Sequence, residues 1–297
     1  MKNNFDDIIN GINNNKEFFD KTAWAEKKQK EREQVFEMID DTASSVIDDE
    51  VSYKQYLDVV SRFDKYSAEN ALLIFAQKPK ATRLADVSRW KKQDVYIKKG
   101  EKGISILEPG NKYKRKDGTE SIGFNVKKLF DISQTNATKE TETSVKYDDR
   151  LILKALLKDA PVPTNISDNL RENTGAAYDH RTKQILVRQG MDGTTIIRTV
   201  AQEMAHAYIA SDIPKEEAYN RLANSFTAHS VSYIICKRTG IDTSEFTFGK
   251  VKDIFTGLNS REIRAELSKM RAVANEIWSN MLVTLNPPVK NKTEQVR

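Results

Sequence analysis

The alternation of apolar and polar positions predicts a chain that is mostly helical, with a strand-rich stretch in its first half. Apolar side chains recur every three or four residues in several long segments, which is typical of helices with one buried face. After Pro79 the spacing changes to every second residue, which is typical of half-buried strands. We expect helices at 24–39, 52–63, 67–77, 151–157, 196–209, 214–237 and 260–281, and strands at 95–97, 104–106, 122–126, 175–177 and 185–187.

Composition divides this pattern into two parts. Residues 136–147 are polar and poor in aromatic side chains, which is typical of a linker. The predicted fold class is therefore α+β in two domains, a helix-plus-small-sheet domain followed by a mainly helical one. The expected boundaries are a helical lead-in at 1–50, a first domain at 51–135, a linker at 136–147, a second domain at 148–285 and a disordered tail at 286–297.

Bulk properties narrow the setting in which the chain works. Of its 297 residues, 38% are hydrophobic and 31% are charged, which suits two domains that each bury a core and keep solvated helices outside. No apolar run approaches the roughly 20 residues that a bilayer requires, and the polar residues 1–7 lack the apolar core of a signal peptide. The single cysteine, Cys236, cannot form an internal disulfide. We therefore expect a cytoplasmic protein without a membrane partner.

Positive charge is concentrated in the first half. The whole chain carries a net charge of +5, yet residues 62–130 alone hold 17 Lys and Arg against 8 Asp and Glu. Within this region the segment 89–103 combines lysines and aromatic rings with Gly100 and Gly103, which permit a tight turn. Single-stranded nucleic acid needs cations along its phosphates and rings on which its bases stack. The candidate DNA contacts are Lys98, Lys99, Lys102, Tyr66, Trp90 and Tyr96.

The second half contains a metal-binding motif with one departure. Gln202-Glu203-Met204-Ala205-His206 reads as the zinc-peptidase helix H-E-x-x-H, in which two histidines hold the metal and the glutamate activates its bound water. Here glutamine replaces the first histidine. Its neutral amide oxygen is a poor ligand for zinc, which prefers imidazole, thiolate or carboxylate. Glu203 stays the candidate general base and His206 a candidate ligand.

A third candidate ligand lies on the following predicted helix. His229 would face His206 if the two helices packed together, as in zinc sites that take their third ligand from a second helix. A lone histidine on a helix is nevertheless more often a hydrogen-bonded residue than a ligand. The candidate metal set is Gln202, His206 and His229, and the sequence leaves open whether it holds a metal.

Further segments can be compared with a known family. In the first half they are 66–70, 72–77, 81–82, Trp90, 98–104 and 130–135, and in the second half 202–207, 228–234 and 240–244. In these segments the chain resembles the ArdC-type antirestriction proteins and related proteins of conjugative elements. The likeness covers about residues 50–280.

This resemblance implies a first domain that binds single-stranded DNA and a zincin-like metallopeptidase domain behind it. It adds Asn70 and Gln77, which lie in matching segments, to the candidate DNA contacts. It also implies a histidine and a glutamate ligand where this chain has Gln202 and His229. Two accounts follow: a site that has lost its metal while the fold persists, or a rearranged site that uses His206 and His229 with a further group.

The sequence thus supports three functional hypotheses. The leading one is a single-stranded-DNA-binding protein of a mobile or conjugative element, acting in antirestriction or DNA establishment, with an inactive metallopeptidase-like domain and no cofactor. The second is an active zinc metallopeptidase in which Glu203 is the general base. The third is a scaffold that binds an acidic protein partner, because basic turns and buried rings also fit the composition of residues 89–103.

Overall fold

The computed structural model describes residues 20–115, 117–137, 147–214 and 218–286. Within these ranges the chain is α+β, as predicted, with many helices and two three-stranded sheets. Residues 1–19 of the expected lead-in, 138–146 of the expected linker and 287–297 of the expected tail lie outside the described residues. The helices are α2 (Lys21–Ser45), α3 (Glu50–Arg62), α4 (Ala68–Gln77), α5 (Val87–Lys91), the 3-10 turn η1 (Ile132–Gln134), α6 (Asp149–Lys158), α7 (Gly193–Ser211), α8 (Arg221–Thr239), α9 (Val251–Ile254) and α10 (Ser260–Leu285).

The first sheet is dominated by a long antiparallel ribbon. Strands β2 (Ile104–Lys114) and β3 (Glu120–Asp131) pair along its length, and the short β1 (Leu84–Ala85) pairs with the end of β3. Gly118, with a φ of +85°, lies in the connecting turn that the Asp117-Gly118 signal predicts. The ribbon is much longer than the predicted strands, because its outer part is polar and the alternation is weak there.

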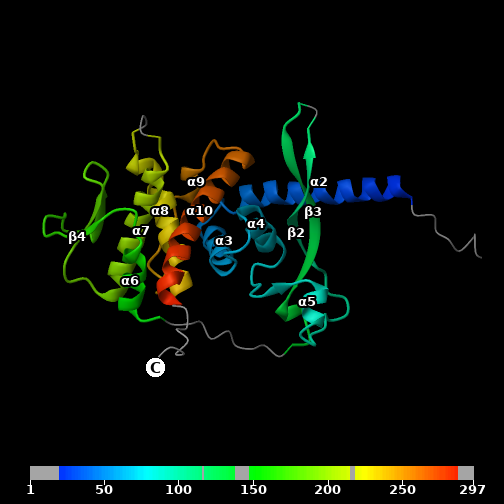
Figure 1. Cartoon of the computed structure of the whole chain (residues 1–297), viewed down its shortest axis with the longest axis horizontal. Coiled ribbons are helices and arrows are strands. Elements are labelled where there is room, and N and C mark those ends of the chain that lie inside the picture. Colours follow the sequence, from blue (N-terminus) through cyan, green and yellow to red (C-terminus); the bar gives the residue numbers. More distant parts are fainter. Residues whose placement is uncertain (1–19, 116, 138–146, 215–217, 287–297) are drawn as a thin grey trace, which may run out of the picture.

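Helix α2 lies across the ribbon and links it to the helical part of the molecule (Figure 1). The ring of Phe36 on α2 meets that of Phe124 on β3 edge to face, with centroids 6.5 Å apart. On the same helix, Val35 and Ile39 are buried in the core. A segment expected as a lead-in therefore contributes to the packing of the ribbon and the helices.

The second sheet lies at the other end of the molecule (Figure 1). Strands β5 (Ala176–Asp179) and β6 (Gln184–Val187) form the predicted hairpin. A further strand, β4 (Thr164–Ile166), runs parallel to β6 and was not predicted, because three residues are too few to establish an alternation. The expected strand at 95–97 is reduced to an isolated bridge between Ile97 and Thr135.

Helices α7 and α8 begin at other residues than the sequence indicates. Helix α7 begins at Gly193, and the Asp192 side chain caps it by accepting from the N–H of Thr195. The predicted start of α8 at Pro214 is wrong, since the helix begins at Arg221 behind an Asn220 cap. Gly240, with a φ of +77°, ends α8.

The two halves of the described chain share packed side chains. The hydroxyl of Tyr53 on α3 lies 3.0 Å from the Ser230 hydroxyl on α8. Tyr233 of α8 donates to the Asp58 carboxylate of α3 at 2.8 Å. Cys236 is fully buried on α8, as expected of a small apolar residue. In the described part of the chain, no helix combines the length and apolarity needed to cross a membrane.

Candidate functional site

Helix α7 directs the altered metal motif toward the protein interior. Glu203 and His206 are buried and Gln202 is partly buried. Helix α8, which carries His229, packs along α7. The four candidate residues are therefore neighbours on two adjacent helices, and their bonds decide what they can do.

The carboxylate of Glu203 is fully engaged. Arg221 donates to both of its oxygens, with Nη1 to Oε2 and Nη2 to Oε1 each at 2.7 Å. The backbone N–H of Tyr178 on β5 donates to Oε2 at 2.7 Å. The Glu203 side chain is only 4% exposed, and its hydrogen bond from Arg221 raises the pKa of that guanidinium. Donors from Arg221 and from the β5 backbone thus hold both oxygens of the Glu203 carboxylate.

His206 is a neutral, buried imidazole. Its Nδ1 is hydrogen-bonded to the Tyr219 hydroxyl, and its Nε2 has no hydrogen-bond partner among the described residues. Burial, with the charge of Arg221 beside it, lowers the pKa of His206 to about 3. A neutral imidazole is the form that binds metals, so the free Nε2 is the feature of this site that best suits a cation.

His229 has a different environment from a metal ligand. Its Nδ1 lies 3.2 Å from Oε1 of Gln202, so the glutamine serves as a hydrogen-bond partner. The imidazole packs between Phe246 and Phe248, with ring centroids 4.9 and 5.0 Å away. This burial lowers the pKa of His229.

These residues do not fit a catalytic metal ion. The described ranges hold no group of three or more His, Cys, Asp or Glu placed to bind one. The amide oxygen of Gln202, the atom that would bind a metal, is already hydrogen-bonded to His229. Arg221 adds a positive charge beside His206, which disfavours a second cation there.

In the first half, the predicted glycine turn is formed. Gly100 has a φ of +88°, the left-handed region that glycine adopts without strain. A Cβ on Gly103 would lie 2.9 Å from the Cβ of Lys128, so a side chain there would force a shift. The turn exposes Lys98, Lys99 and Lys102.

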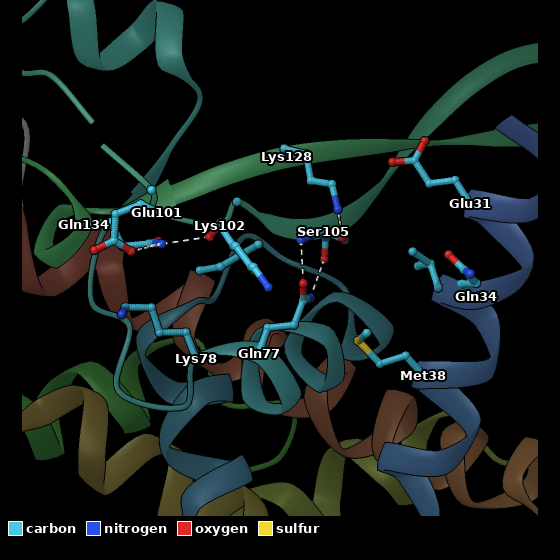
Figure 2. Close-up of a pocket in the computed structure, with 14 residues that line it drawn as sticks. Glu31, Gln34, Met38, Gln77, Lys78, Glu101, Lys102, Ser105, Lys128 and Gln134 are labelled. Carbon is cyan, nitrogen blue, oxygen red and sulfur yellow. Dashed lines mark hydrogen bonds between the residues drawn. The ribbon is translucent and has the colours of Figure 1, made fainter. Parts of the chain in front are cut away.

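The turn borders a groove of about 870 Å³ between α2, the end of α4 and the base of the ribbon. Figure 2 shows Lys102 of the turn, Lys78 after α4 and Lys128 of β3 along it. Glu31 and Glu101 line the same groove. Because cations predominate, the groove suits an anionic chain better than a cationic one.

The candidate aromatic residues divide by exposure. Trp90 is fully buried, and its indole Nε1 donates to the Phe130 carbonyl at 2.9 Å. Trp90 thus belongs to the core, as the alternative interpretation expects, and presents no face on which a base could stack. Tyr96 is 53% exposed and Tyr66 is partly buried, so both have ring surface that a ligand can reach.

Asn70 and Gln77 have a structural role that the sequence did not reveal. The Asn70 amide donates to the Leu107 carbonyl at 2.8 Å and accepts from its N–H at 2.7 Å. Two residues earlier on β2, Gln77 makes the same pair of bonds with Ser105, at 2.9 and 2.8 Å. The two amides of α4 thus complete the outer edge of β2, and contact of these side chains with DNA stays a prediction.

Part of this chain is similar to a known protein family. Residues 25–155 match the family model described as the N-terminal domain of anti-restriction factor ArdC. This match confirms the resemblance noted in the first half over residues 25–155, which are similar to the ArdC N-terminal domain. An uncharacterized protein of Bacillus anthracis is 24% identical over 280 residues, a match that covers 73% of this chain. The chain spans only 46% of the length of that curated relative.

Two solved structures share the fold. The metal-free crystal structure of antirestriction ArdC from plasmid R388 aligns over 74% of this chain and 85% of its own, with 15% identity and a TM-score of 0.50. The Mn(II)-bound structure of the same protein aligns over 75% and 86%, with 14% identity and a TM-score of 0.50. At this identity the likeness concerns the fold, and it agrees with the predicted α+β class.

Sequence reasoning missed the residues that surround Glu203. Arg221 and Tyr219 follow residues 215–217, which lie outside the described ranges, and Tyr178 is in the hairpin. No spacing rule connects them with the motif. Lys78 and Lys128 of the groove were also missed, although both lie within the basic region and a wider count of its lysines would have included them.

Proposed function

We propose that this chain is a single-stranded-DNA-binding protein of a mobile or conjugative element, which works in the cytoplasm in antirestriction or DNA establishment. The observation that carries the proposal is the exposed turn of Lys98, Lys99 and Lys102 beside a lysine-lined groove. This turn lies within residues 25–155, which match the ArdC N-terminal domain. The antirestriction description of the ArdC structures supports the biological setting.

The chemistry of the turn supports a phosphate backbone as its ligand. Three exposed ammonium groups within five residues can follow successive phosphates of a flexible strand. Tyr96, two residues before Lys98, is exposed and can stack on a base. Contacts of this kind give affinity without sequence preference, which suits a protein that meets strands of many sequences.

Replacing Lys98, Lys99 and Lys102 together by alanine is expected to lower affinity for a single-stranded oligonucleotide on the order of 100-fold at about 50 mM salt. The slope of log affinity against log salt should decrease by about 2, because each lost phosphate contact accounts for about 0.7 on single strands. Fluorescence anisotropy titrations over a series of salt concentrations measure both quantities.

The matched control replaces three exposed lysines of the second half, Lys154, Lys158 and Lys250, by alanine. This variant has the same net charge as the first one and should bind as the unmodified protein does. Equal losses in the two variants would mean that net charge alone matters and would refute the assignment of the turn. Failure of the unmodified protein to bind any oligonucleotide at low salt would favour an acidic protein partner instead.

The second half is, in this proposal, a metallopeptidase-like domain without catalytic activity. The support is the bidentate Arg221–Glu203 pair, which engages the candidate general base. The active-peptidase alternative needs a free Glu203 and a third ligand besides His206 and His229, and the described residues offer neither arrangement. The proposed role of this half is structural or partner-binding.

Metal analysis tests this part of the proposal directly. Protein purified and then reconstituted with zinc or manganese is expected to retain less than about 0.1 ion per chain after desalting, because the site lacks a convergent ligand set. Chelator should leave the unfolding temperature unchanged. Inductively coupled plasma mass spectrometry and thermal scans with and without EDTA provide the readout. A content near one ion per chain would contradict the proposal.

A further inference from the structure

A second cavity lies between α2, the start of α4 and the ribbon. It has a volume of about 590 Å³, within the range of pockets that hold small organic groups. Three aromatic side chains from three different elements line it, and we call it the aromatic pocket. They are Phe36 of α2, Tyr66 before α4 and Phe124 of β3.

The rings of this pocket are unusually open to solvent. Phe36 is 37% exposed and Phe124 is 43% exposed, while Ile106 and Leu107 beside them are buried. Phe36 and Phe124 meet edge to face, so neither covers the face of the other. Concave, partly exposed aromatic surface of this kind marks a place where a flat apolar group can bind.

Positive charge lies next to the rings. Burial raises the pKa of the Tyr66 hydroxyl, and the charges of Arg89 and Lys127 oppose that rise, which places both cations near it. Lys65, which also lines the pocket, is exposed.

The acidic side chains around the pocket have basic neighbours. Glu108 is paired with Lys127 at 3.1 Å. Arg264, which lines the pocket, is paired with Asp40 at 3.1 Å. Burial lowers the pKa of Arg271, and the charge of Glu69 opposes that fall. Among the charged residues that line the pocket, Lys65 and Glu108 are exposed, and Glu108 is paired with Lys127. A ligand that joins a flat ring to an anion therefore complements the rings and Lys65.

We propose that the aromatic pocket holds one unpaired nucleobase of single-stranded DNA, stacked on Phe124 or Phe36, with a neighbouring phosphate at Lys65. This inference rests on the proposed function and adds a site to it. The pocket is formed by other residues than the lysine turn and its groove, so the two sites can be tested separately.

The test replaces Phe124 by leucine, which keeps an apolar side chain but removes the ring. Affinity for a single-stranded oligonucleotide is expected to fall about tenfold, since one stacked base is worth about 1 to 3 kcal/mol and each 1.4 kcal/mol is tenfold. The salt dependence should stay unchanged, because no cation is removed. Phe36→Leu should have the same kind of effect. The matched control is Ile122→Ala, an exposed apolar residue of the same strand outside the pocket.

An abasic oligonucleotide identifies the part of the ligand that the pocket recognises. If a base occupies the pocket, Phe124→Leu should no longer reduce affinity when every nucleotide lacks its base. Quenching of 2-aminopurine in an ordinary strand should also decrease in this variant. Equal unfolding temperatures of the variant and the unmodified protein show that its fold is retained.

The outcomes separate this inference from the proposed function. The pocket assignment is overturned if the lysine-turn variant loses binding while Phe124→Leu keeps its affinity. The DNA-binding function then still holds, and the pocket is available for an apolar side chain of a protein partner. An equal loss on ordinary and abasic strands also overturns it. If the unmodified protein binds no oligonucleotide, the function and the inference both fail.

Discussion

Replacing Arg221 by methionine is expected to lower the free energy of unfolding by about 3 kcal/mol. The change leaves the Glu203 carboxylate buried with only the Tyr178 N–H as donor, and removal of one partner of a buried ion pair typically costs about 3 to 5 kcal/mol. We expect the lower end of this range because the Arg221 side chain is 43% exposed, so water can partly replace it. Urea unfolding at pH 7, followed by circular dichroism, measures the difference.

Two further variants show whether the loss comes from the unpaired charge. The double variant Glu203→Leu with Arg221→Met removes both charges and should recover much of the lost stability. Lys252→Met breaks an exposed ion pair with Asp48 and should change stability by less than about 1 kcal/mol. If Arg221→Met lowered the free energy of unfolding no more than Lys252→Met does, the Arg221–Glu203 pair would not be the interaction that holds α7 to the start of α8.

Replacing Asn70 by leucine is expected to cost about 2 to 4 kcal/mol of stability. The change leaves the N–H and the carbonyl of Leu107 unpaired in a buried position, and each unsatisfied buried group costs about 1 to 3 kcal/mol. Amide hydrogen exchange should show faster exchange at Leu107. Urea unfolding gives the accompanying loss of stability.

Gln77→Leu is the internal comparison for this prediction. It removes the same two bonds at Ser105, but Gln77 is only partly buried, so water can reach the freed groups and the loss should be smaller. Unchanged protection of the Leu107 amide in Asn70→Leu would show that Asn70 does not secure the edge of β2. A loss of oligonucleotide affinity at full stability would instead assign Asn70 to DNA contact.

The helices and hairpins could be predicted because their apolar spacing is set by a buried face. Helix α10 illustrates this, since Asn259 caps it with a reciprocal bond from Glu262 and its apolar stripe is buried along its length. The start of α8 could not be predicted in the same way. Its cap, Asn220, comes after a polar run that also fits a helix. Arg221, the first residue of the helix, is held by its bonds to Glu203, which lies elsewhere in the sequence.

The candidate site was predictable in its residue types and not in its bonds. The departure at Gln202 drew attention to α7, but the partner of Glu203 is fixed by packing and has no sequence signal. Trp90 and Asn70 lie in segments that resemble the ArdC-type proteins, yet both are buried and bonded to the backbone of the ribbon. Residues in such a segment can thus maintain the fold without contacting a ligand.

The amides that α4 places on β2 also bear on self-association. An unpaired strand edge is a template on which a second polypeptide can add, and Asn70 and Gln77 occupy this template at the base of the ribbon. Further out, Pro109 offers no N–H and an irregularity between Pro109 and Lys112 interrupts the register. The long ribbon can therefore project from the molecule with little tendency to nucleate aggregates along β2.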